Sequence, residues 1–373
     1  MSAHLKQDEP DTANRLDSMK QGVIGQPISR VEGLAKVTGT APYAAEYPIE
    51  GCVEGVLATA TITRGEILKI DKDSVLGMPG VIAVIDDPRL TTRAAQGTAN
   101  EAPQQSPRTV CYWGQPIALV VAETFEQARD AAKHLAVEYR PHDGAPLSPD
   151  AVKPEEQEDE TVRQGDLVHA MSEAAHSVDV TFTTKGHASA AMEPHAAIAE
   201  WDSDKLTVHA SLQMPNYNIS ELADSLDLDE EQIRLVSRFV GGGFGSKLGV
   251  SEDVVAASIA AMELGRPVRV VMSRQQVFQC IMRRSETTQR LRLAADQKGR
   301  LSGFGHEALV SNLPGETFAA ADCAEITVVG AGYADTNGVY ALSSDNSNLV
   351  GNQHEHPRFC KGGCDKAVFN HYG

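Results

Sequence analysis

The sequence predicts a mixed α+β protein with more than one domain. Short apolar runs typical of buried strands alternate with helical patterns, and an acidic, proline-containing stretch (148–166) separates two such regions. A length of 373 residues is sufficient for two or three hydrophobic cores. We therefore expect a first α/β domain at 28–145, an acidic linker at 146–165 and a second domain at 166–318.

The first domain should begin after a polar, disordered lead-in, residues 1–27. Glycines and Pro42 in 29–47 favour extended segments joined by turns. The clearest unit is a buried strand, IALVVA, followed by a helix that Thr124 caps, with Gln127 at the capping-box position. The other elements expected here are a strand in 51–62, a strand, short helix and second strand in 67–87, and a last strand, AVEYRP.

The second domain should contain two hairpins and two helices. A helix ends at Gly265 and Pro267, and its alanines indicate core packing. Hairpin turns are expected at Asp202–Asp204 and Lys298–Gly299. The elements in chain order are a strand at 177–184, a hairpin at 196–213, a helix and strand at 220–237, a helix at 252–264, a strand, VRVVMS, and a hairpin at 289–311.

The composition is that of a globular protein without a nucleic-acid or membrane surface. The net charge is −18, which argues against binding to polyanions. No apolar run is long enough to span a bilayer, and the first residues lack a secretion signal. The six cysteines are scattered, unlike those of a disulfide scaffold. We expect a cytoplasmic protein, or a periplasmic one if a partner carries the signal.

The last segment, 319–373, is rich in Gly, Asn and Ser and reads as an unrelated or displaced β-rich or irregular tail. It holds side chains at loose zinc spacing, but such residues also gather by chance, so we predict no metal site there. A second group, of arginines, either faces a phosphate or is simply solvated. The tail residues are His354, His356, Cys360, Cys364 and His371; the arginines are Arg283, Arg284, Arg290 and Arg292.

The most unusual stretch is FVGGGFGSKLG (239–249). Successive glycines accept positive φ and leave room for a ligand to touch the backbone, and their N–H groups can form a concavity that accepts an anion. The spacing fits neither a Walker A loop, because Ser246 precedes Lys247, nor a Rossmann loop. By itself the pattern leaves two readings open, a structural turn and a ligand-binding loop.

Five motifs in order give this chain a family resemblance. They are RVEGLAKVTGTAPYAAE, GQPIALVVAETFEQARDAA, AMEPHAAIAEW, SLQMP and VGGGFGSK. Together they resemble the molybdopterin-binding large subunit of the xanthine dehydrogenase/aldehyde oxidase family, over about residues 28–318 and in the bacterial separate-subunit type. The resemblance implies an α/β hammerhead domain at 28–145, then the first half of the molybdenum-cofactor-binding domain at 166–318.

The resemblance also implies a binding site. It makes Gln213 a hydrogen-bond partner of an oxo ligand of molybdenum, and the backbone of Gly242, Gly243, Phe244 and Gly245 a surface against the cofactor. The cofactor would be molybdenum-molybdopterin, in its cytosine dinucleotide form. MEPH (192–195) is expected to be scaffold, so Glu193 and His195 are assigned no chemistry.

Two departures from the family pattern shape the predicted function. Leu248 stands where xanthine-oxidising members have a glutamate, which favours aldehydes, aromatic or aliphatic, oxidised to carboxylic acids with water as oxygen donor. No residue matches the family's RAPG-like arginine or the catalytic glutamate of its GxGE motif. We therefore assign no catalytic residue and expect a truncated chain, inactive alone; the alternative is a non-catalytic fragment or fusion that acts as a binding or assembly module.

The same resemblance implies partners. The chain has neither an iron–sulfur cysteine cluster nor an FAD motif. Electrons would therefore leave through an iron–sulfur subunit and an FAD subunit of one complex, and the substrate would be a small aldehyde.

Overall fold

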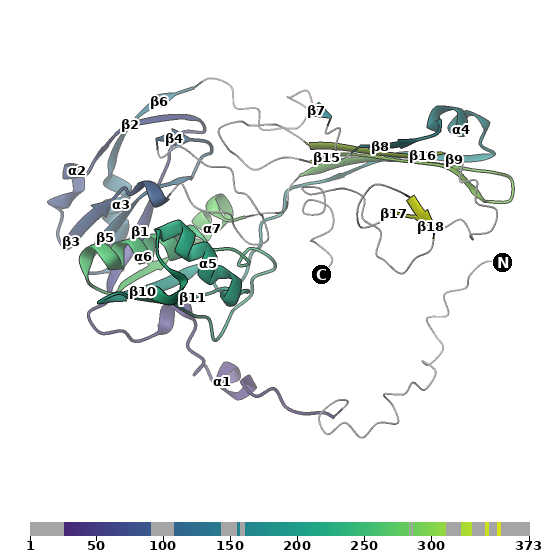
Figure 1. Cartoon of the computed structure of the whole chain (residues 1–373). Helices are drawn as coiled ribbons and strands as arrows, with labels where there is room; N and C mark the ends of the chain where they lie inside the picture. The colour runs from purple at the N-terminus through teal and green to yellow at the C-terminus, as the bar shows by residue number, and fades with distance from the viewer. Residues whose placement is uncertain are drawn as a thin grey trace. The chain divides into compact units, whose positions relative to one another are not determined.

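The structure is a computed structural model. It describes residues 26–90, 108–142, 155–156, 161–282, 284, 286–310, 322–329, 340–342 and 349–351. The chain divides into two compact units, Met1–Pro42 and Tyr43–Gly373. Figure 1 shows the ribbon with its element labels.

Among the described residues of the first unit, 26–42, a short helix, α1 (Gly33–Val37), forms where we expected extended chain. The amide and the hydroxyl of Thr38 both donate to the carbonyl oxygen of Leu34, and this closes a helical turn. Gly39 follows at φ +71° and ends it. The prediction of extended chain was wrong for these five residues, because Gly39 marks the end of a helix rather than a bend between extended pieces.

A seven-stranded sheet forms the centre of the second unit, with the order β12-β11-β10-β13-β1-β5-β3. Strands from both predicted domains share it, because β1 pairs in parallel with β13 from Val53↔Val268 onward. The boundaries predicted between the domains stay predictions. The strands are β1 (Val53–Thr59), β3 (Val81–Ile85), β5 (Pro116–Ala122), β10 (Ala196–Asp202), β11 (Lys205–Ala210), β12 (Ile233–Val236) and β13 (Val268–Val271).

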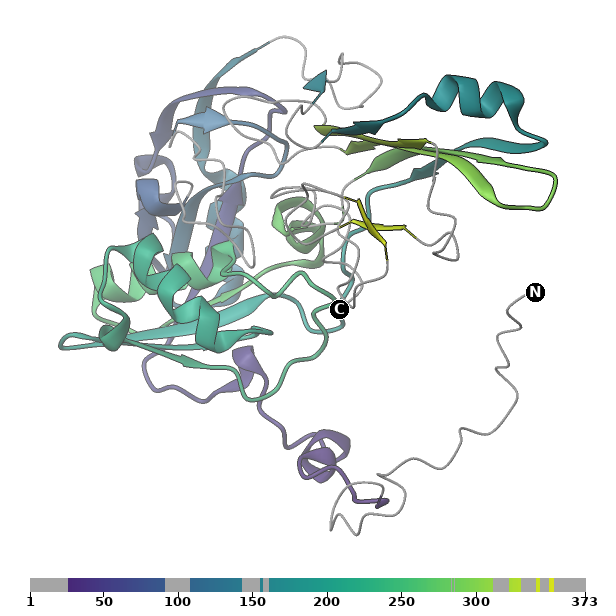
Figure 2. The same ribbon diagram turned by 45° about the vertical axis from the view of Figure 1, so that its right-hand side comes forward.

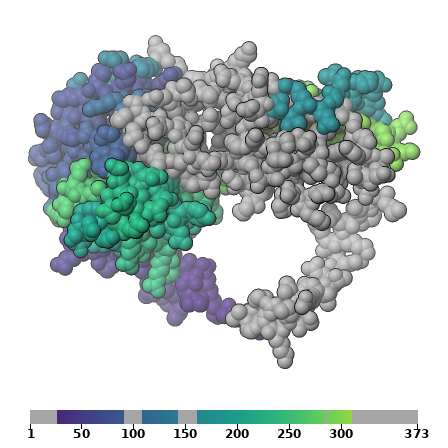
Figure 3. Space-filling model, viewed as in Figure 1, coloured from purple at the N-terminus to yellow at the C-terminus, as the bar shows by residue number. Residues whose placement is uncertain are grey.

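Helices cover this sheet on both faces. All seven residues of β5 are buried: Leu119 packs in the core cluster that contains α6 (Glu252–Leu264), and Val120 packs in a second cluster with Ala131 of α3 (Phe125–His134). A strand covered on both faces has no polar side, which explains the run IALVVA. Next to α6 lies α5 (Pro215–Leu226), as Figures 1 and 2 show. In the space-filling view α5 lies at the surface (Figure 3).

We expect Leu119→Ala to destabilise the fold by about 2–5 kcal/mol, because the side chain has no solvent exposure and the cavity left behind cannot fill completely. Urea unfolding measures the change. Leu68→Ala is the matched control, because Leu68 is 47% exposed and its truncation should cost well under about 1 kcal/mol. Equal losses in the two variants would contradict the buried position of β5.

Local signals in the sequence are confirmed at several helix ends. Thr124 accepts from the amide of Gln127 at 3.4 Å, and the Gln127 side chain accepts from the amide of Thr124 at 3.2 Å. Helix α6 ends at Gly265, which has φ +59°. The short helices near these elements are α2 (Asp73–Leu76), α7 (Arg274–Cys280) and the 3-10 turns η1 (Ala44–Glu46), η2 (Pro88–Leu90) and η5 (Glu230–Gln232).

A second sheet is built around the predicted hairpin of β14 (Thr287–Ala295) and β15 (Leu301–Val310), which turns at Gly299 with φ +76°. Helix α4 (Leu167–Glu173) packs on it: a Cβ at Gly305 would lie 2.4 Å from Leu167. Its remaining strands are β7 (Glu155–Glu156), β8 (Val162–Gln164), β9 (His176–Thr184) and β16 (Asp322–Val329). Two small sheets contain β2 (Gly65–Asp71), β4 (Thr109–Val110) and β6 (Ala136–Pro141), and β17 (Tyr340–Leu342) and β18 (Leu349–Gly351).

Stability should fall as the pH drops below about 6.5, because burial lowers the pKa of both His209 and His306 below the ordinary histidine value. Below that pH the unfolded chain binds more protons at these histidines than the folded chain does, so the free energy of unfolding decreases as the pH falls. Urea unfolding at about pH 7 and about pH 5.5 measures this. We expect His209→Gln/His306→Gln to show a smaller decline than the parent chain, and an equal decline would contradict the assignment.

Candidate cofactor site

The glycine-rich segment forms an irregular loop between β12 and α6, as predicted. Its backbone needs left-handed conformations: φ is +103° at Gly242, +53° at Phe244 and +93° at Gly245. The backbone of Phe244 is strained, since residues with side chains rarely adopt such values. Its side chain is 69% exposed, whereas Gly243, Ser246 and Lys247 are buried, so the loop is open to solvent around Phe244.

Gln213 lies directly against this loop. A Cβ atom at Gly243 would come within 2.2 Å of the Gln213 side-chain oxygen, so only glycine fits there while Gln213 keeps this position. That oxygen, Oε1, accepts from the amides of Gly245 at 3.0 Å and Lys247 at 3.3 Å. The Gln213 amide donates to the carbonyl oxygen of Lys247 at 2.7 Å. Because Oε1 is used by the loop, the Nε2 group of Gln213 is left to donate to something else.

Three successive amides of the loop have no acceptor among the residues that the structure describes. They belong to Gly242, Gly243 and Phe244, whereas the amides of Gly245 and Ser246 are taken by Gln213 and by the carbonyl oxygen of Gly243. Unpaired N–H groups on a loop with few side chains can bind an electronegative ligand. Of the predicted residues, Gln213, Gly242, Gly243 and Phe244 thus offer donors, while the amide of Gly245 serves the loop itself.

The MEPH segment lies behind the loop. His195 is 2% exposed, and its Nε2 lies 3.0 Å from the carbonyl oxygen of Ser246. The Glu193 side chain is 11% exposed and accepts from the amide of Gly241 at 2.6 Å. Both residues therefore support the loop as scaffold, as the sequence indicated. The sequence did not reveal that Lys247 joins them: its side chain is completely buried, away from the open side of the loop.

The predicted arginine group divides into two kinds. Arg290 pairs with Asp179 at 2.7 Å, and Arg292 pairs with Glu307, so both belong to the second sheet rather than to a phosphate site. Arg284 lies next to the loop, because a Cβ at Gly245 would be 3.2 Å from its guanidinium. Arg283 lies outside the described residues.

No cluster of three or more potential metal ligands occurs among the described residues, and none of their helices is long and apolar enough to cross a membrane. The tail candidates His354, His356, Cys360, Cys364 and His371 lie outside that part of the chain.

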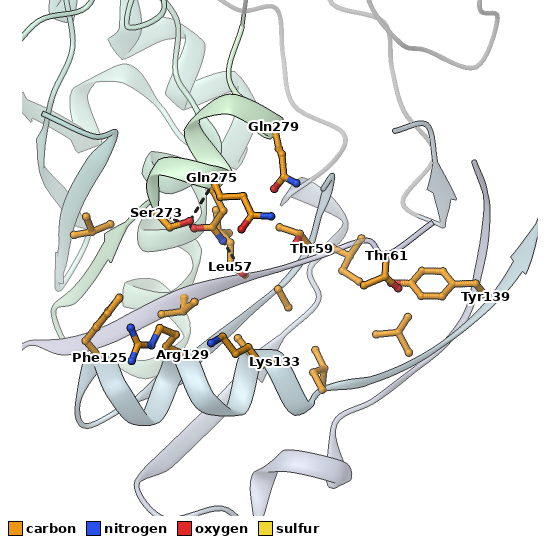
Figure 4. A pocket seen from close by; sticks show the side chains of 18 residues that line it. Leu57, Thr59, Thr61, Phe125, Arg129, Lys133, Tyr139, Ser273, Gln275 and Gln279 are labelled. Carbon is orange, nitrogen blue, oxygen red and sulfur yellow. Dashed lines mark hydrogen bonds between the residues drawn. The ribbon is translucent and has the colours of Figure 1, made fainter. Parts of the chain in front are cut away.

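A separate cavity of about 590 Å³ lies between α3 and α7, over β1 (Figure 4). Arg129 and Lys133 reach towards it from α3, and Gln275 and Gln279 from α7. None of the predicted cofactor residues lines it. The cavity is therefore distinct from the loop site.

The family model "Molybdopterin cofactor-binding domain" matches residues 151–344, which is more than half of the chain. A second model, "Aldehyde oxidase and xanthine dehydrogenase, a/b hammerhead domain", matches residues 38–143. The chain belongs to the aldehyde oxidase and xanthine dehydrogenase family. The resemblance and the fold class inferred from the five motifs are thus confirmed.

Members of this family match across most of the chain. The aldehyde oxidoreductase molybdenum-binding subunit PaoC of Escherichia coli K12 is 38% identical over 320 residues, which cover 84% of this chain and 43% of PaoC. The nicotinate dehydrogenase large molybdopterin subunit of Eubacterium barkeri is 27% identical, covering 75% of this chain and 68% of that subunit. The chain therefore spans less than half of PaoC.

Solved structures of the family share the fold. The aldehyde oxidoreductase of Desulfovibrio gigas superimposes with a TM-score of 0.62 and 26% identity, covering 73% of this chain and 33% of that one. The loop's unpaired amides and the Nε2 donor of Gln213 fit a group rich in hydrogen-bond acceptors. The residues present thus fit the molybdopterin cofactor of the family.

Proposed function

We propose that this chain forms one side of the cofactor site of a molybdenum hydroxylase that oxidises aldehydes to carboxylic acids with water as oxygen donor. The observation that carries the proposal is the contact of Gln213 Oε1 with the amides of Gly245 and Lys247, because it leaves the Gln213 Nε2 group and three loop amides as donors. The relative PaoC, an aldehyde oxidoreductase subunit by name, supports the substrate class.

The chain's own residues would hold and orient the cofactor. Bound molybdenum and pterin supply the two-electron oxidation. The amides of Gly242, Gly243 and Phe244 and the Nε2 group of Gln213 would donate to electronegative atoms of the cofactor, and donors fixed in advance stabilise charge that develops during a reaction. Leu248 offers no carboxylate, which favours an apolar aldehyde over a polar heterocycle.

We further propose that the catalytic base comes from polypeptide outside these 373 residues. No GxGE motif occurs in the sequence, and a general base typically contributes about 10²–10⁴ in rate. The matched region forms 68% of the nicotinate dehydrogenase large molybdopterin subunit, so a comparatively short molybdopterin chain has a precedent among the relatives. The complex would also include an iron–sulfur and an FAD subunit, with the cofactor in its cytosine dinucleotide form and the complex in the cytoplasm or, through a partner's signal, the periplasm.

The test is expression of the chain with its maturation chaperones and neighbouring subunits, followed by molybdenum, pterin and nucleotide analysis and aldehyde-dependent dye reduction. We expect about one molybdenum per chain. Cofactor-free protein without turnover would contradict the proposal. Because no residue matches the catalytic glutamate, a second function is considered: a non-catalytic binding or assembly module, for which partner subunits would co-purify with a metal-free chain.

A further inference from the structure

A buried polar cluster lies on the side of the loop opposite the proposed cofactor. It consists of Lys247, Glu193 and Ser211. The Lys247 side chain has no solvent exposure, the Glu193 side chain has 11%, and Ser211 has 4%. Charged side chains are rarely buried so completely, since removing a charge from water costs free energy unless it is fully paired.

Every polar group of the cluster has partners. The Lys247 ammonium donates to the Glu193 carboxylate at 3.0 Å, to the Glu193 carbonyl oxygen at 3.0 Å and to Ser211 Oγ at 2.7 Å. The same Glu193 carboxylate oxygen accepts from Ser211 Oγ at 2.5 Å and from the amide of Gly241 at 2.6 Å. The three donors of the lysine are thus used, which compensates its burial.

The cluster connects three places along the chain. Gly241 is the first residue of the glycine run and Lys247 comes shortly after its last, so Glu193 binds both ends of the loop. Ser211 comes just before Leu212 and Gln213, at the end of β11. One buried ion pair therefore fixes both the span of the loop and the distance from the loop to the Gln213 carboxamide.

We propose that Lys247 and Glu193 are positioning residues, which hold the glycine loop and Gln213 in one preorganised arrangement for an acceptor-rich ligand. The proposal rests on the proposed function for the identity of that ligand, but not for the arrangement itself. Lys247 would act from behind the loop without touching the cofactor, in contrast to the lysine of a phosphate-binding loop, whose ammonium contacts the ligand.

The test compares Lys247→Met with Lys247→Met/Glu193→Gln in the full chain. Lys247→Met leaves the Glu193 carboxylate buried without its cation, so the midpoint of thermal unfolding should fall. The double variant also removes that charge and should recover most of the loss, which separates stability from positioning. The carboxamide introduced by Glu193→Gln can still accept from the amide of Gly241, so only the Lys247 end of the loop is released.

Amide hydrogen exchange, resolved to single residues by fragmentation, gives the decisive readout. In the double variant we expect the amide of Gly245 to exchange about tenfold faster, while that of Gly241 stays near the parent value. Molybdenum content per folded chain should fall by about tenfold when the chain is expressed with its maturation system. Asp179→Asn, which breaks the exposed pair with Arg290, is the control and should change neither quantity.

The possible failures are distinguishable. If the parent chain holds no molybdenum yet Gly245 exchanges faster in the double variant, the proposed function fails and the positioning role stands. If the double variant recovers its stability with Gly245 exchange at the parent rate, the positioning role is overturned, whatever the molybdenum content of the parent.

Discussion

Gly243→Ala should sharply reduce binding of the proposed molybdopterin cofactor. The added Cβ would lie 2.2 Å from Oε1 and 2.5 Å from the carboxamide carbon of Gln213, which is far closer than atoms can approach. The methyl group would have to expel the Gln213 side chain, and with it the acceptor for the amides of Gly245 and Lys247. We expect molybdenum content to fall at least about tenfold, since both the donor and the shape of the loop are lost.

The measurement is metal and pterin analysis of the purified complex, with urea unfolding to show that the variant is folded. Gly77→Ala is the matched control: Gly77 has an ordinary backbone φ of −84°, and nothing lies within 4 Å of its added Cβ. Its molybdenum content should equal that of the parent. If Gly243→Ala contains as much molybdenum as the parent, binding of the cofactor does not depend on this loop.

The second large effect is expected from Gln213→Glu. A glutamate keeps an oxygen that can accept from the amides of Gly245 and Lys247, so the loop should stay in place. The variant loses only the Nε2 donor and adds a negative charge beside the proposed cofactor. We expect aldehyde oxidation per bound molybdenum to fall by about 10²–10³, the loss seen when one preorganised donor is removed from an active site.

Dye reduction per molybdenum atom measures this loss in the assembled complex. Gln275→Glu, the same change at an exposed position of α7, is the control and should leave the rate unchanged. Activity at the parent level in Gln213→Glu would assign the carboxamide to loop support alone. If the variant instead loses molybdenum while its rate per molybdenum atom is unchanged, the Nε2 donor of Gln213 serves to retain the cofactor.

Much of the local structure could be predicted because the signals are themselves local. The Thr124 capping box, the end of α6 at Gly265 and the turn at Gly299 each depend on residues a few positions apart. The position of the glycine-rich loop between β12 and α6 was also predicted, but the run of glycines by itself left open both a structural turn and a ligand-binding loop. The family resemblance implied Gln213 as a site residue, but only the structure shows its contact with the loop amides.

The parts that sequence reasoning missed depend on distant partners. The burial of Lys247 was not predicted, because only the fold brings Glu193 and Ser211 to its ammonium. The one available signal was a single lysine within an otherwise apolar or glycine-rich stretch. Arg290 appeared able to face a phosphate, but its carboxylate partner Asp179 comes from another strand, more than a hundred positions away. A pattern within a short window of sequence cannot reveal a pairing between residues that are so far apart in the chain.

The parallel pairing of β1 with β13 has a consequence for how this protein is made. Glu54 and Arg269, which are directly paired across these two strands and form a salt bridge, are 215 positions apart. During synthesis β1 therefore emerges from the ribosome long before its neighbour exists, and one of its edges has no hydrogen-bonding partner in that interval. We expect the nascent chain to be prone to aggregation until residue 271 has left the ribosome and β13 can pair with β1.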